Sequence, residues 1–154
     1  MRGIVHYLIS YGKQQRDDDM RKVRSKLSKK NRWYISQHVF LTVYHYCLNY
    51  QEWKCEHDLN IGLTRGGGDG AGGGVGDPTA TQAIRLADLA ERINLIEQTA
   101  YDAEPELSPY ILMYVTRGDL TFDKLKALGM ACERKMFYDR RRKFYWLMSR
   151  RLKL

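Results

Sequence analysis

The stretch from Ser108 to Leu154, SPYILMYVTRGDLTFDKLKALGMACERKMFYDRRRKFYWLMSRRLKL, carries the clearest structural signal in the chain. Ser108 is a typical helix N-cap, and Pro109 suits the first helical position, where a missing N–H costs nothing. We therefore expect a short helix over residues 110–116. Gly118 is expected to end it.

A second and a third helix are expected to follow. Thr121 is placed to cap a short helix over residues 122–128, whose apolar residues share one face: Phe122, Leu125 and Leu128. Gly129 would then supply a tight turn. After it, helical spacing indicates a long helix from Cys132 to about Arg151.

The long helix has two chemically different sides. One side carries apolar residues: Phe137, Phe144, Leu147 and Met148. The other side carries polar and basic residues: Arg134, Lys135, Tyr138 and Arg142. A short helix, a turn of three to four residues with glycine and an exposed polar helix are typical of proteins that insert a helix into the major groove of DNA. The sequence thus predicts a helix-turn-helix within residues 108–151.

Charge is unevenly distributed along the 154 residues, whose formal net charge is +8. Residues 1–36 contain ten basic and three acidic residues, whereas residues 37–130 contain seven basic and thirteen acidic ones. Residues 131–154 contain nine basic and two acidic residues, including the run Arg140–Lys143. Such clusters usually neutralise phosphates, so we expect the basic ends to contact nucleic acid. The acidic segment, residues 37–130, is expected to be either a scaffold that does not itself touch DNA or a surface that binds a basic protein.

Upstream of this region, Asp77 and Pro78 are expected to start a further helix. Its apolar residues recur at alternating spacings of three and four, which forms a heptad seam: Leu86, Leu89, Ile93, Ile96 and Ala100, widened by Ile84, Ala87 and Ala90. The seam must pack against another helix. Its partner is either the C-terminal helices of the same chain or a second copy in a homodimer.

The first half of the chain divides into three parts. Residues 1–32 form a basic N-terminal arm, and residues 33–61 are expected to be helical, with Ser36 capping a helix that ends near Tyr50 and a short helix over residues 51–59. Residues 62–76, GLTRGGGDGAGGGVG, contain nine glycines and predict a flexible linker. Residues 77–154 are expected to form a helical DNA-binding region that contains the helix-turn-helix. The predicted fold class is all-α.

Several other functions are disfavoured by the sequence. The acidic triplet Asp17–Asp19 cannot easily gather around one ion, because adjacent helical residues point in different directions. Cys47, Cys55 and His57 lack a second close-spaced ligand pair, so we expect neither a zinc site nor any other cofactor. Without converging catalytic groups, the chain is not expected to be an enzyme. No apolar stretch is long enough to span a bilayer, and three unpatterned cysteines fit a reducing cytoplasm.

The order of these segments resembles a known family. The glycine-rich loop, the following DPTATQAIRLADLAERINLIEQTA and the final ACERKMFYDRRRKFYWLMSRRL are similar to RinA-like activators of late transcription from prophages of Gram-positive bacteria. The resemblance covers most of the chain from about Trp33, and YHYCLNYQEWKCEHDL also matches it. It implies a sigma-region-4-like helix-turn-helix, binding to duplex DNA and contact with host RNA polymerase. Compared with these activators, the chain has an additional stretch before Met20. A further hypothesis is therefore that translation of the native protein begins at Met20.

The residues expected to contact DNA follow from this resemblance and from the charge. Base contacts are implied early in the last helix, at Cys132, Glu133, Arg134, Lys135, Tyr138 and Asp139. Phosphate contacts are expected from Arg141, Arg142 and Lys143. The predicted function is a sequence-specific DNA-binding activator of phage or prophage late transcription. The alternative is a small terminase-like subunit that recognises DNA for packaging, which would form rings.

Overall fold

The computed structural model describes residues 29–65 and 78–154, and these residues form α-helices and one short 3-10 helix, with no strand. The all-α fold class predicted from the sequence is therefore confirmed. In chain order the elements are α2 (Gln37–Leu48), α3 (Tyr50–Arg65), α4 (Pro78–Ala103), η1 (Pro105–Leu107), α5 (Ser108–Thr116), α6 (Phe122–Ala127) and α7 (Arg134–Arg151). None of the helices in the described ranges is long and apolar enough to cross a membrane.

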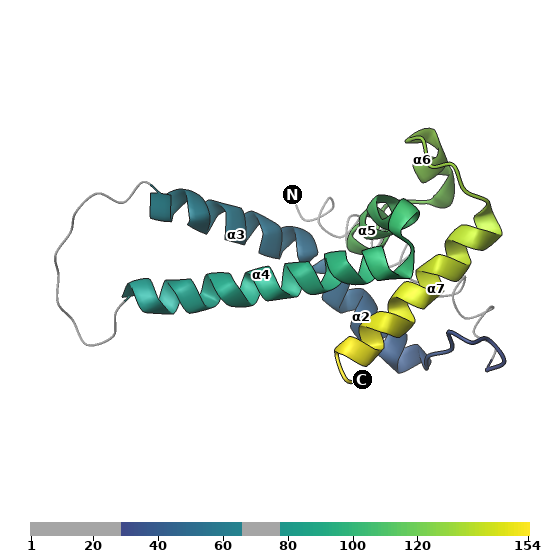
Figure 1. The fold of residues 1–154 in the computed structure, drawn as a ribbon, viewed down its shortest axis with the longest axis horizontal. Coiled ribbons are helices and arrows are strands. Elements are labelled where there is room, and N and C mark those ends of the chain that lie inside the picture. Colours follow the sequence, from purple (N-terminus) through teal and green to yellow (C-terminus); the bar gives the residue numbers. More distant parts are fainter. Residues whose placement is uncertain (1–28, 66–77) are drawn as a thin grey trace, which may run out of the picture.

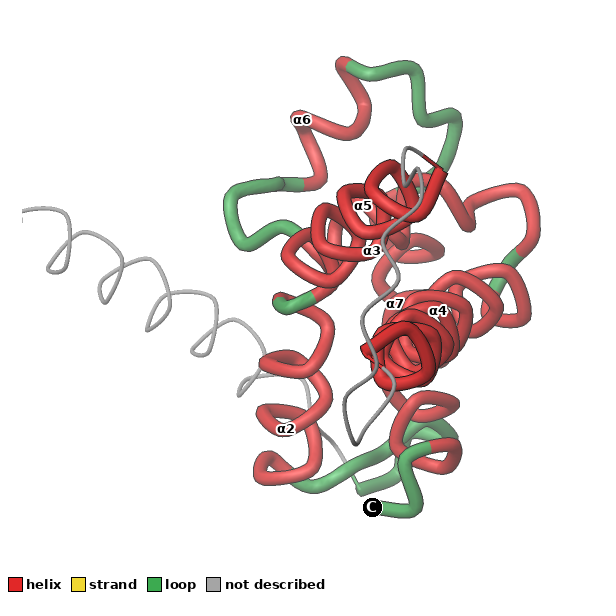
Figure 2. Tube along the Cα trace, turned by 90° about the vertical axis from the view of Figure 1, so that its left-hand side faces the viewer, coloured by secondary structure: helices red, strands yellow, loops and turns green. Residues whose placement is uncertain are grey.

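The molecule has a globular part and a projecting helical pair. Figure 1 shows α3 and the first half of α4 running antiparallel and extending away from the remaining helices. In the globular part, α5 and α7 pack against the second half of α4, and α2 packs against α5 and α7 (Figure 1). Figure 2 shows the same arrangement from the end, with α6 and the C-terminus at opposite ends of the globular part.

Helix α4 is the element that joins these parts. Its buried residues Leu89, Ile93, Ile96 and Ala100 belong to the predicted heptad seam, and they contact α3, α5 and α7 of the same chain. The buried part of the seam is thus packed within one chain. Ile84, which was expected to widen the seam, is instead 72% exposed. It lies in the projecting part of α4, where α3 is the only neighbouring helix among the described residues.

Local sequence signals place several helix starts correctly. The side chain of Ser36 accepts a hydrogen bond from Val39 N at the start of α2, and that of Thr121 accepts one from Lys124 N at the start of α6. Gly129 has a φ of 97°, which few other residues adopt, so the turn after α6 depends on it. These caps satisfy backbone N–H groups that have no partner inside the helix.

Other local predictions need correction. Ser108 is not an N-cap: α5 begins at Ser108 itself, and the Ser108 hydroxyl donates to Pro105 O at 2.9 Å because η1 leads directly into the helix. Helix α3 continues to Arg65, so residues 62–65 of the predicted linker are helical, while residues 66–77 lie outside the described part. Helix α3 as a whole packs against α4, with Arg85 ion-paired to Glu56.

The core draws on both sides of the glycine-rich segment. Residues from α2, among them Phe40, Val43 and Cys47, are buried in one cluster with residues of α4, α5 and α7. The two predicted helical segments therefore share one hydrophobic core. Desolvation in this core raises the pKa of the Cys47 thiol well above its ordinary value, so the group stays protonated and behaves as a small apolar side chain.

Candidate nucleic-acid interface

Helix α7 carries most of the residues expected to contact DNA, and one of its faces is part of the core. Its buried residues recur at helical spacing: Phe137, Phe144, Tyr145, Met148 and Ser149. Phe137 packs its ring against Tyr114 of α5 and Phe122 of α6, at centroid distances of 5.4 and 5.7 Å. Helix α7 is therefore fixed to the bundle along its length, and only its remaining faces can meet a partner.

The first turn of α7 is the most exposed part of the predicted site. Arg134, Lys135 and Met136 are exposed, as is Glu133, which occupies the N-cap position without a side-chain capping bond. The turn between α6 and α7 is longer than predicted, since it spans residues 128–133. As a result Cys132 and Glu133 precede the helix instead of belonging to it, and Leu128 is exposed at the end of α6 rather than buried.

Arg134 points toward α6. Its Nη2 lies 2.7 Å from Asp123 Oδ1, and its guanidinium lies over the Phe122 ring at 4.7 Å from the centroid. Both members of the ion pair are more than half exposed, and pairs of this kind typically contribute less than about 1 kcal/mol. A phosphate or a base edge can therefore replace Asp123 as the partner of Arg134 at little cost.

A shallow surface hollow lies beside this turn. It is lined by residues of α6, of the connection into α7 and of the start of α7: Phe122, Lys126, Ala131, Cys132, Glu133 and Arg134. The Cys132 thiol donates to Glu133 O at 3.3 Å, and partial burial raises its pKa. At neutral pH Cys132 is thus a neutral wall of the hollow, not a charged contact residue.

The basic run 140–143 does not form one patch. Arg141 Nη1 donates to the Tyr114 hydroxyl at 2.9 Å, and the guanidinium lies between the rings of Tyr114 and Tyr138. Lys143 Nζ donates to Ala103 O at 3.0 Å, and Arg140 Nε lies 2.9 Å from Glu104 Oε2. These three side chains fasten α7 to α5 and to the C-terminal end of α4, where positive charge is favourable to the helix dipole.

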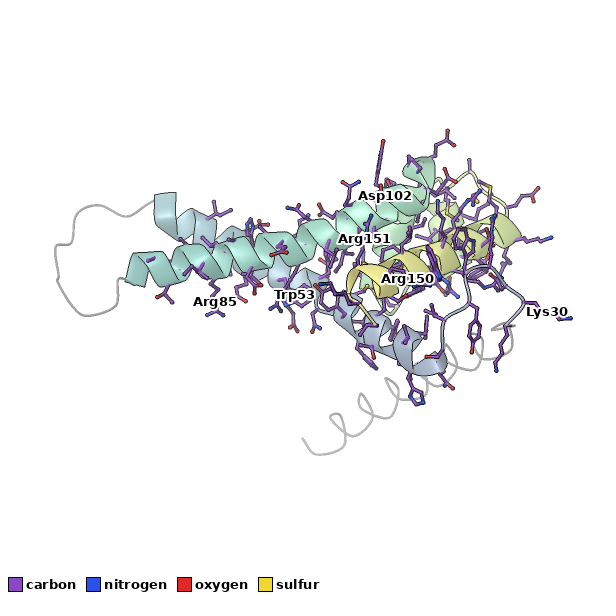
Figure 3. All side chains as sticks on the ribbon, turned by 60° about the horizontal axis from the view of Figure 1, so that its bottom comes forward. Lys30, Trp53, Arg85, Asp102, Arg150 and Arg151 are labelled. Carbon is purple, nitrogen blue, oxygen red and sulfur yellow. The ribbon has the colours of Figure 1, made fainter. Side chains whose placement is uncertain are left out.

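Arg151 also has a structural role. Its guanidinium forms an ion pair with Asp102 and donates to the Thr99 hydroxyl at 2.6 Å. Figure 3 shows Asp102 and Arg151 side by side, where the last turn of α7 crosses α4. The hydrogen bond from Arg151 and, to a smaller extent, the one from Gln98 lower the pKa of the Asp102 carboxyl. The Asp102–Arg151 ion pair is therefore weakened only by acid well below neutral pH.

Lys135 and Arg142 have neither an ion pair nor a side-chain hydrogen bond with another described residue. Of the other predicted contact residues, Tyr138 packs against Phe137 and Phe122, and the Asp139 carboxylate lies 3.3 Å from Arg32 and 3.7 Å from Arg140. Of the predicted contact residues, Arg134 and Lys135 are therefore exposed next to each other in the first turn of α7. Arg142 is partly accessible further along the helix.

One segment that contacts α7 was not predicted from the sequence. The segment 29–35, treated as the end of the basic arm and the start of the fold, lies against α7: besides the Arg32–Asp139 pair, the Trp33 and Trp146 rings lie 5.3 Å apart. No local signal links positions more than a hundred residues apart. The Asp17–Asp19 triplet and the arm before residue 29 lie outside the described residues.

The cysteines and histidines form no ion site in the described part. Cys47 is buried in α2, whereas Cys55 is exposed on α3, and His57 lies 3.4 Å from the neighbouring Asp58. Within residues 29–65 and 78–154, no group of three or more His, Cys, Asp or Glu side chains is arranged to hold a metal ion.

Comparisons with protein-family models, with curated proteins and with solved structures found no match to this chain.

Proposed function

We propose that this protein is a non-enzymatic, sequence-specific binder of duplex DNA that activates phage or prophage late transcription. The observation that carries the proposal is the exposed first turn of α7, where Arg134 and Lys135 project beside α6 from a helix anchored in the core. A helix approaches base edges in the major groove with its first turns, and this is the part of α7 left uncovered. The phage setting and contact with host RNA polymerase rest on the resemblance to RinA-like activators.

The proposal gives the predicted residues different roles. Arg134 and Lys135 are the candidates for base contacts, because arginine and lysine donate hydrogen bonds to guanine O6 and N7. Arg142 is the candidate for a phosphate contact. Arg141 and Lys143 act through α7, since their polar atoms already bind Tyr114 and Ala103. A rigid α7 presents Arg134 and Lys135 with little loss of conformational entropy on binding.

The experiment that tests the proposal is selection from a pool of duplexes with randomised sequence, followed by titration of the selected duplex and a scrambled one across a salt series. A recovered motif whose preference over the scrambled duplex persists as salt rises is the expected result, because base contacts depend less on counterion release than phosphate contacts do. Equal and steeply salt-dependent binding to both duplexes would contradict sequence-specific binding.

Replacing Arg134 with alanine should weaken binding to the selected duplex by about 1–3 kcal/mol while changing binding to the scrambled duplex much less. Arg117→Ala is the matched control, because Arg117 is also an exposed arginine paired with an aspartate, 3.7 Å from Asp119, but lies in the α5–α6 connection. Fluorescence anisotropy of labelled duplexes measures both affinities. Equal losses on the two duplexes for Arg134→Ala would assign this residue to a phosphate contact.

A second function, recognition of DNA for packaging, is favoured by the projecting α3–α4 pair. This pair carries large apolar side chains that face solvent: Leu59, Ile61 and Ile84. Packaging subunits combine a DNA-binding helical part with an oligomerising one, and they assemble as rings. Sedimentation equilibrium discriminates the two functions: we expect a monomer or dimer, and a closed ring of many subunits would favour packaging.

A further inference from the structure

One side of α7 lies mostly outside the core. Its residues recur at spacings of three and four, as the buried ones do, and they are exposed or half-buried, with Trp146 also packed against the edge of the core: Lys135, Asp139, Arg142, Trp146 and Arg150. We call this set the outer face of α7. Four of its five residues are basic or aromatic, whereas Asp139 is an acid in the middle of a surface that would otherwise suit a polyanion.

Arg32 and Trp33, at the end of segment 29–33, contact this outer face. Arg32 Nη2 is 3.3 Å from Asp139 Oδ2, and the Trp33 ring packs against the Trp146 ring. Arg32 also lies over Trp33, and Arg150 lies over Trp146, at 4.7 and 5.2 Å from the ring centroids. Two tryptophans in contact, each covered by an arginine, therefore join the segment to the helix, and the contacts among these four residues are of favourable cation–π or aromatic types.

The junction places additional positive charge beside the outer face. Lys29, Lys30 and Arg32 are exposed on the segment, and on α7 Lys135 and Arg150 are exposed and Arg142 is half-buried. Figure 3 shows Lys30 at the edge of the globular part and Arg150 on α7, far from Arg85 on the projecting pair. A surface on which basic side chains surround a rigid aromatic junction matches a nucleic-acid backbone better than it matches a protein, because phosphates need several cations at once.

We propose that segment 29–33 and the outer face of α7 form one composite surface that binds the phosphate backbone of the DNA duplex. This inference rests on the proposed function and adds a second contact region to the first turn of α7. Within the surface, Asp139 is a positioning residue: it holds Arg32 toward the duplex and does not contact a base. Trp33 and Trp146 fix the segment to the helix, so its charges approach the backbone without first being ordered.

The role of Asp139 can be tested by whether its substitution strengthens or weakens binding to DNA. Asp139→Asn removes a negative charge, so simple electrostatics predicts tighter binding to DNA. If Asp139 positions Arg32, the same substitution frees Arg32 and loses its phosphate contact. We therefore expect Asp139→Asn to weaken binding to a scrambled duplex and to reduce the magnitude of the slope of log K against log salt by about 0.9, the value of one phosphate contact.

The experiment is a salt series of duplex titrations with wild type, Asp139→Asn, Arg32→Gln and the double variant. Arg32→Gln should reduce the slope to the same extent, and the double variant should lose no more than either single one, because both remove one contact. Asp88→Asn is the matched control: Asp88 lies 2.9 Å from Arg92 on exposed α4, so it is also an ion-paired aspartate on a helix surface. Thermal unfolding verifies that each variant is folded.

The outcomes separate this inference from the proposed function. An unchanged or steeper slope for Asp139→Asn, with affinity raised as in Asp88→Asn, would overturn the composite surface while sequence-specific binding through Arg134 stood. Absence of duplex binding by the wild-type protein at low salt would overturn both. A reduced slope in Asp139→Asn and Arg32→Gln, without further loss in the double variant, supports the surface.

Discussion

Phe137→Ala should lower the free energy of unfolding by about 3–5 kcal/mol, the largest effect that we expect from a single substitution in this protein. The Phe137 side chain is fully buried, and its ring lies among Tyr114, Phe122 and Tyr138. Removing it leaves a cavity at the point where α5, α6 and α7 meet. Chemical denaturation followed by circular dichroism measures the loss.

The matched control for this substitution is Met136→Ala. Met136 precedes Phe137 in α7 but is 42% exposed, so its truncation should change the free energy of unfolding by no more than about 0.5 kcal/mol. Hydrogen exchange adds a regional test, because the amides of α6 should lose protection in Phe137→Ala before those of α4. If the two variants were equally stable, Phe137 would not be the residue that fixes α6 to α7.

Ile96→Ala should destabilise the protein by about 2–5 kcal/mol. Ile96 is fully buried in the second half of α4, the helix that packs against α3, α5 and α7. Its truncation therefore weakens the contacts on which both the projecting pair and the globular part depend. The measurement is again denaturant unfolding, with the slope against denaturant compared to wild type in order to verify two-state behaviour.

Ile84→Ala provides the same chemical change on the same helix at an exposed position. It should leave the stability almost unchanged or raise it by a few tenths of a kcal/mol, because alanine has the higher helix propensity. A large, concentration-dependent loss in Ile84→Ala would show that this residue is covered by a second copy in solution. That result would favour the oligomeric packaging function over the activator function.

Features governed by neighbouring residues could be predicted from the sequence. Ser36 and Thr121 cap helices because their hydroxyls reach backbone N–H groups three residues ahead, and Gly129 adopts a positive φ that its lack of a side chain permits. The heptad seam of α4 was likewise predicted, since periodicity reports which residues share a face. The all-α class follows from the sum of such signals.

The predictions that failed concern residues whose environment is set from elsewhere in the chain. Ile84 has the apolar character of a seam residue, but α4 extends beyond the globular part at that point, so the residue faces solvent. Leu128 continues the apolar spacing of α6, yet the helix ends at Ala127 and the side chain is exposed. Ser108 fails as a cap because a 3-10 helix precedes it.

In the candidate site, too, features set by neighbouring residues were predicted from the sequence and those set by distant residues were not. Sequence composition determined that the C-terminal helix is strongly basic and has one apolar side, and it indicated the exposed Arg134 and Lys135 at the start of that helix. From the sequence alone, Arg140–Lys143 were expected to form one basic cluster. In the structure these four neighbours have different surroundings, because successive residues of an α-helix point about 100° apart and each meets whatever element packs there.

What the sequence by itself determined is therefore the helical class, the helix starts and the amount of charge on each segment, all of which depend on interactions over a few residues. Only the tertiary structure decided which charges are available to a partner. Arg141 is held by Tyr114 and Lys143 by Ala103, whereas Arg142 has no ion pair or side-chain hydrogen bond with another described residue, and Asp139 pairs with Arg32, 107 residues away in the sequence. The physical reason is that a side chain's partner is chosen by packing between elements distant in sequence, which local propensity does not encode.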